Sequence, residues 1–318
     1  MPEYCVTGGT GFIAAYLVKE LLSRGHHVRA TVRDPEDEGK VGFLRGMDGA
    51  KERLRLMKAD LMVEGSFDDA VDGVDGVFHT ASPVFSGSNI QETLIEPALK
   101  GTMNVLKSCV QASLIKRVVL TSSCSAIRYR HDSTSLSPLN ESHWSDTEYC
   151  KRFNLWYAYG KTMAEKEAWK FVEENGLDLV VVNPSFVVGP VLTPKPTSTL
   201  LKILLLMKGD SASYPNTTIG FVHINDVVSA HMLAMEDSRA SGRLICSSSV
   251  AHWSEVVEML RTKYPAYPIS NNCDDKQGDN NPHSMDTNKV KELGLKSFKT
   301  ITQMFDDCIQ SFQQKGLL

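Results

Sequence analysis

The sequence predicts an α/β fold: a doubly wound parallel sheet with a smaller C-terminal lobe. Three observations lead to this prediction. Short apolar runs alternate with helical patterns, a glycine-rich turn follows the first run, and prolines interrupt the chain after Pro184. Parallel strands need crossover connections, usually helices, so this alternation favours a parallel sheet covered by helices. The chain has 318 residues, 42% of them hydrophobic, which is enough for a large buried core.

Six short apolar runs predict the strands of this sheet. They cover residues 4–7, 27–32, 54–58, 76–80, 118–122 and 179–183. Between the first two, apolar residues recur at helical spacing from Ile13 to Leu22, and Gly25 predicts the C-terminal cap of that helix. Further along, an apolar segment spans Thr199–Met207, and Ser270–Pro282 is rich in Asn and Asp and predicts an exposed loop.

Composition and charge exclude several classes of function. The net charge of -4 leaves no basic field for nucleic acid. The longest apolar run, residues 203–207, is too short to span a membrane, and residues 1–10 carry no signal-peptide pattern. The seven cysteines form no CxxC pair and the nine histidines make no ligand cluster, so we expect reduced thiols, no metal and a cytoplasmic location.

The turn after the first strand predicts a pyrophosphate site. It comprises Thr7, Gly8, Gly9, Thr10, Gly11, Phe12 and Ile13. Glycine permits a tight turn and a close approach of the anion, and the start of a helix offers free N–H groups to it. A tight strand-to-helix connection is the alternative, but the strand before and the helix after supply the context that a dinucleotide site needs.

The residues after the second strand select the dinucleotide. An NAD site usually has a carboxylate here for the ribose 2′-hydroxyl, whereas Arg33 matches a 2′-phosphate, and Lys40 adds positive charge. We interpret Asp34 as a turn residue; a solvated turn arginine is the alternative for Arg33. After the third strand, Asp60 can accept from the adenine amino group or merely close a turn. The sequence predicts NADP(H).

Tyr157 and Lys161 form the predicted catalytic pair. They lie four residues apart, hence on one face of a helix. A phenol with a pKa of about 10 is a poor acid–base group at neutral pH, and a nearby ammonium joined by bound NADP⁺ lowers that pKa. Carbonyl reduction needs a second hydrogen-bond donor, and Ser123, just past the fifth strand, can supply it. Because such a pair also arises by chance, the prediction of a carbonyl reductase depends on its combination with Ser123 and the glycine-rich turn.

These motifs resemble the extended short-chain dehydrogenase/reductase superfamily, and within it the plant dihydroflavonol-reductase and cinnamoyl-CoA-reductase group. The runs that carry the resemblance are residues 28–35, 77–83, 151–153 and 156–157. The resemblance implies a Rossmann domain, NADPH with Arg33 and Lys40 at its 2′-phosphate, and Ser123, Tyr157 and Lys161 as catalytic residues. The resemblance also implies that Thr80 and Ala81 lie along the cofactor's ribose and Pro184 beside the nicotinamide, and we expect Leu61, Ser82 and Val187 to complete the cofactor site.

Other runs are similar to one branch of that group, the tetraketide α-pyrone reductases of plants. These are residues 122–130, 140–146 and 183–190. The likeness implies reduction of a ketone on the alkyl chain of a hydroxy-α-pyrone, in sporopollenin biosynthesis for the pollen exine, and an association with the polyketide synthase of that pathway. The chain departs from the rest of the group in two places. Residues 154–159 read Asn-Leu-Trp-Tyr-Ala-Tyr, where cinnamoyl-CoA reductases typically have Asn-Trp-Tyr-Cys-Tyr, and Arg128 stands where dihydroflavonol reductases usually have Asn, so neither of those substrates is the one we expect.

The substrate site is predicted from two further features. A 4-hydroxy-2-pyrone is anionic at neutral pH, and Arg128 can pair with it bidentately beside Ser123. The segment Leu200–Met207 can line an apolar slot for the alkyl chain. The alternatives are a surface arginine and an ordinary core helix.

The predicted organisation follows from these sites. We expect an NADP-binding domain over residues 1–184, to which residues 220–246 return, with Gly220–Glu236 as a strand and a helix. We expect a substrate-binding lobe over residues 185–219 and 247–318. Three other functions stay open: reduction of a phenylpropanoid such as a CoA thioester held by Arg128, Arg130, Lys151 and Arg152; a non-catalytic NADP-binding regulator; and a nucleotide-sugar epimerase or dehydratase.

Overall fold

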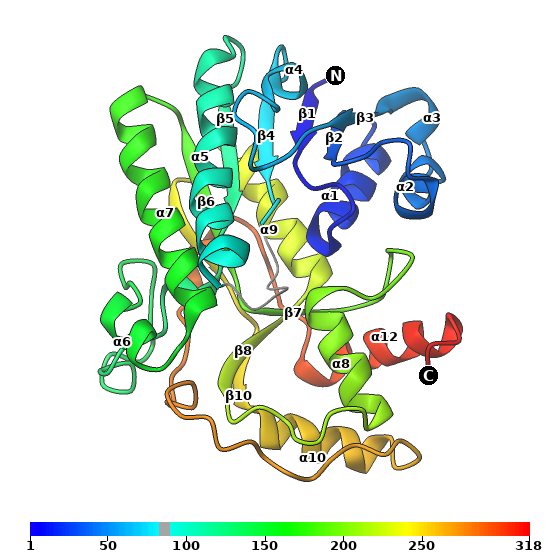
Figure 1. Ribbon diagram of the computed structural model, residues 1–318, viewed down its shortest axis with the longest axis vertical. Coiled ribbons are helices and arrows are strands. Elements are labelled where there is room, and N and C mark those ends of the chain that lie inside the picture. Colours follow the sequence, from blue (N-terminus) through cyan, green and yellow to red (C-terminus); the bar gives the residue numbers. More distant parts are fainter. Residues whose placement is uncertain (83–89) are drawn as a thin grey trace.

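The computed structural model describes residues 1–82 and 90–318, and its main feature is a sheet of seven parallel strands (Figure 1). In order across the sheet these are β3 (Leu54–Lys58), β2 (His27–Val32), β1 (Glu3–Val6), β4 (Gly76–His79), β5 (Arg117–Thr121), β6 (Leu179–Pro184) and β9 (Gly242–Cys246). The chain winds outward from β1 to β3, then crosses to β4 and winds the other way. The predicted fold class is confirmed, and ligands of such sheets bind where the winding reverses, at the carboxyl ends of β1 and β4.

All six predicted strands are present within one residue of their predicted bounds. The first helix, α1 (Phe12–Ser23), ends as predicted. Gly25 has a φ of +83° and its N–H donates to the carbonyl of Leu22, while His26 donates to Leu21. A residue with a Cβ is disfavoured in that left-handed conformation, which is why glycine ends this helix.

Helices cover both faces of the sheet. On one face lie α4 (Asp68–Val71), α5 (Glu96–Gln111) and α7 (Trp156–Asn175), and on the other lie α1 and α9 (Ile224–Glu236). Strand residues alternate between the two cores: Val118 and Leu120 pack with the α5–α7 side, whereas Val119 packs with the α1–α9 side. The short helices α2 (Glu38–Arg45) and α3 (Ala50–Arg53) connect β2 to β3.

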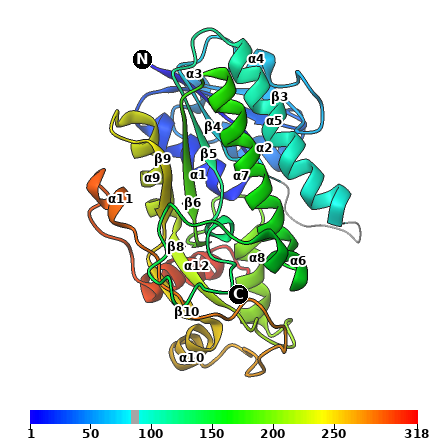
Figure 2. The ribbon, with the colours of Figure 1, turned by 90° about the vertical axis from the view of Figure 1, so that its left-hand side faces the viewer.

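A second, three-stranded sheet lies at the carboxyl end of the large one, where β6 leads into β7 (Figures 1 and 2). Its strands are β10 (Ser249–His252), β8 (Thr218–His223) and β7 (Phe186–Val188). Phe186 of β7 and Phe221 of β8 pack with Trp253 and Phe305, edge to face in every pair but the tilted Phe221–Phe305 pair. The remaining elements are η1 (Gln91–Ile95), η2 (Cys124–Ala126), α6 (Thr147–Arg152), α8 (Ser198–Lys208), α10 (Trp253–Lys263), α11 (Asn288–Glu292) and α12 (Ile301–Gln314).

Residues 220–246 divide between the two sheets, whereas the sequence predicted that Gly220–Glu236 would return to the NADP-binding domain as a strand and a helix. Helix α9 packs on β5, β6 and β9, and β9 joins the large sheet. Strand β8 pairs with β7 and β10 in the small sheet and with no described strand of the large one. One apolar core runs from α1 and α9 into α8, α10 and α12 without a break. No helix among the described residues has the length and apolarity to cross a membrane.

Candidate active site

The glycines of the turn allow its backbone to pack closely against neighbouring residues. Gly8 has a φ of +72°, and a Cβ there would lie 3.0 Å from the Cβ of Ala81. A Cβ on Gly9 would lie 3.0 Å from the Cβ of Ala30, and one on Gly11 would lie 3.1 Å from the carbonyl oxygen of Gly8. These distances are shorter than most Cβ contacts, and the positive φ of Gly8 disfavours other residues, so the turn suits the backbone cradle that a dinucleotide pyrophosphate needs.

Helix α1 begins directly at this cradle. Its N-cap is Gly11, which has no side chain to cap the free N–H groups of the first turn. Phe12 is buried beneath the turn, while Thr10 and Ile13 are partly exposed around it. A bound anion would satisfy these N–H groups and lie at the positive end of the helix dipole.

Thr7 holds the cradle against the neighbouring strand. Its hydroxyl accepts hydrogen bonds from the backbone N–H groups of Thr80 (3.1 Å) and Ala81 (3.0 Å) and lies 2.8 Å from Nδ1 of His79. The Thr80 hydroxyl donates to the Thr7 carbonyl at 2.6 Å. The carboxyl ends of β1 and β4 are therefore fixed to each other, which places the predicted cofactor residues 80–82 beside the turn. Pro83, at the end of the 77–83 run, lies outside the described residues.

Arg33 follows the last residue of β2 and is exposed, with no hydrogen bond or ion pair to any other described residue. A free guanidinium at this position fits the 2′-phosphate of an NADP ribose. Lys40 lies on α2 and is also exposed, but its ammonium pairs with Asp37 at 2.6 Å. Asp34 accepts a hydrogen bond from the N–H of Glu36, which agrees with its interpretation as a turn residue.

Asp60 closes a turn after β3. Its carboxylate accepts from the N–H of Met62 at 2.8 Å, and its own carbonyl and N–H both bond to the hydroxyl of Ser66. The side chain is exposed, which leaves its second oxygen on the surface. Leu61 is partly buried against Gly101, and its carbonyl accepts from Asn104 at 2.8 Å.

Ser123 lies two residues beyond β5, at the carboxyl edge of the sheet. It caps the short helix η2: its hydroxyl oxygen accepts from the N–H of Ser125 at 3.0 Å. That bond fixes the oxygen and leaves the hydroxyl proton to donate elsewhere. Pro184 ends β6 on the neighbouring side, and Val187 is buried in β7, where its carbonyl accepts from the Thr199 hydroxyl.

Tyr157 and Lys161 lie one turn apart at the start of α7, as predicted. The ammonium of Lys161 is 6.0 Å from the centre of the Tyr157 ring and 3.5 Å from the carbonyl oxygen of Thr121 on β5. Burial lowers the pKa of Lys161 to about 8, opposed by the carboxylate of Glu165. Tyr157 is 45% exposed as a residue, yet burial of its hydroxyl raises the pKa, opposed by a hydrogen bond with the Ser123 side chain. The chain alone therefore does not produce the lowered tyrosine pKa expected with a bound cofactor.

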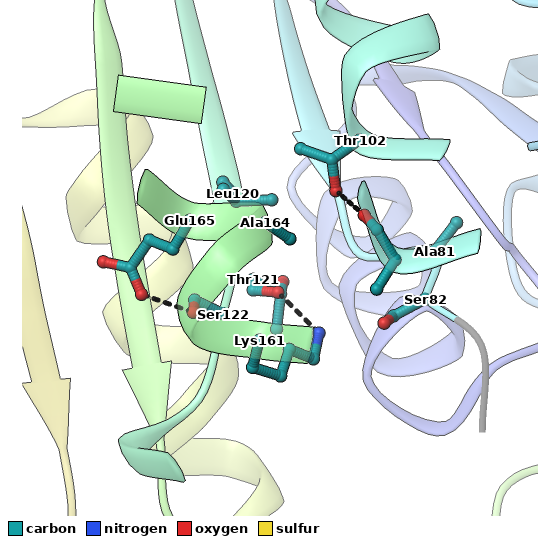
Figure 3. A pocket seen from close by; sticks show the side chains of 10 residues that line it. Ala81, Ser82, Thr102, Leu120, Thr121, Ser122, Lys161, Ala164 and Glu165 are labelled. Atoms are coloured by element: carbon teal, nitrogen blue, oxygen red, sulfur yellow. Dashed lines mark hydrogen bonds between the residues drawn. The ribbon is translucent and has the colours of Figure 1, made fainter. Parts of the chain in front are cut away.

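A small cavity joins the two halves of the site (Figure 3). Ala81 and Ser82 from the end of β4 face Lys161 across it, and Thr121 and Glu165 complete its wall. A second hollow between Ser82 and Tyr157 adjoins the first. The structure thus brings Ala81 and Ser82, which lie beside the glycine-rich turn, together with the pair on α7.

The sequence predicted that Arg128 would bind an anionic pyrone, with a surface arginine as the alternative, but the structure places it in a buried ion pair. Its side chain is only 3% exposed, so it is not a surface arginine. The guanidinium pairs with Asp279, contacts the Tyr129 hydroxyl and donates to the carbonyl of Thr218 at 2.8 Å. Pairing with an anionic pyrone would have to displace Asp279. In α8, Leu200 and Met207 are buried in the core, as the alternative interpretation expected, whereas Leu201 and Leu205 are exposed.

The sequence reasoning missed a buried polar network behind the pair on α7. Glu165 follows Lys161 by one more helical turn and is ion-paired with Arg243 on β9. Asn183 at the end of β6 joins Glu165 to the backbone of Ser123. The spacing of Tyr157, Lys161 and Glu165 at intervals of four was a visible signal, because it puts a carboxylate on the catalytic face of the helix.

Comparison with known proteins identifies the family. A model of the "NAD dependent epimerase/dehydratase family" matches residues 4–245. This chain belongs to that family. It is 68% identical to tetraketide alpha-pyrone reductase 2 of Arabidopsis thaliana, over all of both chains. It is 44% identical to a cinnamoyl-CoA reductase of Medicago truncatula, over 98% of this chain and 95% of that one.

A solved structure agrees with this assignment. The crystal structure of a yeast methylglyoxal/isovaleraldehyde reductase in complex with NADPH matches with a TM-score of 0.83 at 27% identity, covering 99% of this chain and 100% of that one. The predicted family and the predicted oxidoreductase class are therefore confirmed, and the chain uses a nicotinamide cofactor.

Proposed function

We propose that this protein uses NADPH to reduce a ketone on the alkyl chain of a hydroxy-α-pyrone. The observation that carries the proposal is the 68% identity to a tetraketide alpha-pyrone reductase along the entire length of both proteins. The arrangement of Ser123, Tyr157 and Lys161 beside the glycine-rich turn supports it, because these groups suit carbonyl reduction.

Three side chains supply the proton chemistry. NADPH, when bound, supplies the hydride that the carbonyl carbon receives. Tyr157 carries its proton at neutral pH, as a phenol with a pKa of about 10 or above does, and can donate it to the carbonyl oxygen once Lys161 and the bound cofactor favour the phenolate. The Ser123 hydroxyl donates a second hydrogen bond to that oxygen, and the ammonium of Lys161 stabilises the phenolate that remains.

The proposed preference for NADPH depends on Arg33. Arg33→Ser is expected to lower kcat/KM for NADPH by about 10- to 150-fold and to leave that for NADH unchanged, because a hydrogen bond to a charged group contributes about 1.5–3 kcal/mol. Steady-state kinetics with both cofactors measures this. Arg45→Ser is the control, since Arg45 pairs with Glu38 on the exposed face of α2. An equal loss with both cofactors would contradict the role of Arg33 at a 2′-phosphate.

A phenylpropanoid CoA thioester is the second candidate substrate, because of the 44% identity to a cinnamoyl-CoA reductase. Two of the four basic residues that would bind CoA phosphates have acidic partners on the surface: Arg130 pairs with Asp132 at 2.5 Å and Lys151 with Glu148 at 2.8 Å. Arg152 has no ion pair with any described residue, and its guanidinium lies 5.5 Å from the centre of the Phe153 ring. Arg128 is buried with Asp279. The pairings of Arg130 and Lys151 count against CoA binding, whereas the pairing of Arg128 with Asp279 opposes an anionic pyrone and a CoA phosphate alike.

A substrate panel decides between the candidates. With NADPH, an alkyl tetraketide pyrone is expected to exceed a dihydroflavonol and a cinnamoyl-CoA in kcat/KM by about 10²-fold, the discrimination typical of a site shaped for one ligand. Free CoA should not compete. A preference for the thioester, with inhibition by CoA, would overturn the substrate. NADP binding without turnover would indicate a regulator, and conversion without net NADPH loss an epimerase or dehydratase.

Three further assignments stay predictions: the cytoplasmic location, the association with a polyketide synthase, and the division into an NADP-binding domain and a substrate-binding lobe. The cysteines are compatible with a reducing compartment, since all seven are free thiols and only Cys273 is exposed.

A further inference from the structure

A fully buried ion pair lies behind the catalytic helix. Glu165 on α7 is 1% exposed and Arg243 on β9 is 6% exposed, with Nε of the arginine 2.6 Å from Oε1 of the glutamate. Taking both charges out of water is costly, and hydrophobic residues of the same volume often serve stability as well or better. A pair in this position therefore calls for a role other than stability.

The carboxylate of Glu165 connects the helix to the strand ends that carry Ser123. Its Oε2 accepts from the Ser122 hydroxyl at 2.5 Å (Figure 3) and from the side-chain amide of Asn183 at 2.9 Å. The same amide nitrogen donates to the carbonyl of Ser123 at 3.2 Å. Helix α7, which carries Tyr157, is thus tied through Asn183 to the backbone of Ser123.

Arg243 extends this connection to the segment that follows Ser123. Its guanidinium donates to the carbonyls of Glu141 (3.0 Å), His143 (2.5 Å) and Ala126 (3.5 Å). It also stacks on the Trp144 ring, 3.9 Å from the centre. Arg243 therefore neutralises Glu165 and holds the loop beyond η2 in one place.

The electrostatic effect of Glu165 falls on Lys161. The titratable groups that face Lys161 are Tyr157 and Glu165 on its own helix and His79 at the end of β4, while Thr121 on β5 offers a carbonyl. Of these, the carboxylate of Glu165 favours the ammonium form, and burial opposes it. His79 is uncharged at neutral pH, since burial lowers its pKa to about 3.

We propose that Glu165, held by Arg243, is a positioning residue for the reduction: it fixes Ser123 relative to Tyr157 and keeps Lys161 in its ammonium form. This inference rests on the proposed catalytic roles of Ser123, Tyr157 and Lys161. It assigns Glu165 no contact with substrate or cofactor.

The test compares Glu165→Gln with Glu3→Gln in the full-length enzyme with NADPH and the alkyl pyrone. Glu3 also pairs with an arginine, Arg29, at 2.9 Å, but at the amino end of β1, away from the site. E165Q should lower kcat by about 10- to 100-fold, because a small misplacement of a catalytic group has effects of this size, with little change in the KM for NADPH. E3Q should keep the wild-type kcat.

The pH profile separates positioning from a merely structural role. The ammonium of Lys161 supports reduction, so activity is present below its pKa and falls as pH rises through about 8. E165Q removes the negative charge that favours the ammonium and leaves Arg243 unpaired nearby, and both effects move that fall to lower pH. A kcat loss no greater than that of E3Q, or an unmoved alkaline limb, would overturn the proposal.

Two additional variants keep the result interpretable. If E165Q does not fold, E165Q/R243Q has no unpaired buried charge; it should fold and still lose kcat, and a wild-type kcat there would equally overturn the proposal. Tyr157→Phe in the same series tests the catalytic set itself. If Y157F is inactive while E165Q keeps a kcat as high as that of E3Q, only the proposed role of Glu165 is wrong. If Y157F is active, the catalytic role of Tyr157, on which the proposal rests, is wrong.

Discussion

Tyr157→Phe is expected to lower kcat by about 10²- to 10⁴-fold, the usual contribution of a general acid, while NADPH binding stays close to wild type. The substitution removes one hydroxyl and keeps the ring at the start of α7. The carbonyl oxygen then receives the hydrogen bond of Ser123 but no proton as hydride arrives. The glycine-rich turn and Arg33, which bind the other end of the cofactor, are unaffected.

Single-turnover kinetics measures the loss of reduction rate, and a fluorescence titration with NADPH measures the affinity for the cofactor. Tyr159→Phe is the matched control, because Tyr159 lies on the same helix, two residues further on, with its ring packed against Trp156. Its kcat should equal that of the wild type. A Y157F enzyme that kept a tenth of the wild-type kcat would remove Tyr157 from the role of proton donor.

The parts of the site that could be predicted from the sequence are those built from residues close together in the chain. The cradle is one turn between a strand and a helix, and the pair Tyr157–Lys161 is one turn of a helix, so spacing alone specifies both. Ser123 was found because the carboxyl ends of parallel strands share one edge of the sheet. Each of these signals lies within a few residues of sequence.

The parts that escaped prediction join residues far apart in the chain. Glu165 and Arg243 are 78 positions apart and Arg128 and Asp279 are 151 apart, so no local pattern pairs them. Arg128 therefore looked like a free cation, although the fold supplies its counter-ion. The strand near Gly220 has the same difficulty: its apolar pattern predicts a strand but not which sheet its hydrogen bonds join.

Lys161→Met is expected to abolish most activity and yet make the cofactor-free protein more stable at pH 7. The ammonium of Lys161 is buried, and its only hydrogen bond among the described residues is a long one, 3.5 Å, to the Thr121 carbonyl. Burial lowers its pKa from 10.5 to about 8, which corresponds to about 3 kcal/mol against the folded state when the lysine is charged. Methionine has a similar length and carries no charge.

The pH dependence of this difference tests its cause. Between about pH 8 and 10.5 the unfolded chain holds a proton on Lys161 that the folded chain has lost, so wild-type stability gains from this group as pH rises through that window. Below pH 8 both states hold the proton and the full cost persists. The advantage of K161M should therefore be largest at pH 7 and shrink towards pH 10.

Urea unfolding of the cofactor-free proteins at pH 7 and pH 9 measures the effect, with Lys170→Met as control, because Lys170 is exposed on the same helix. K170M should match the wild type at both pH values. A K161M protein less stable than the wild type at pH 7 would mean that the ammonium is well solvated or paired. If K161M is instead more stable than the wild type at pH 7, the charge of Lys161 destabilises the fold. We then infer that the lysine is retained at this position because reduction requires it.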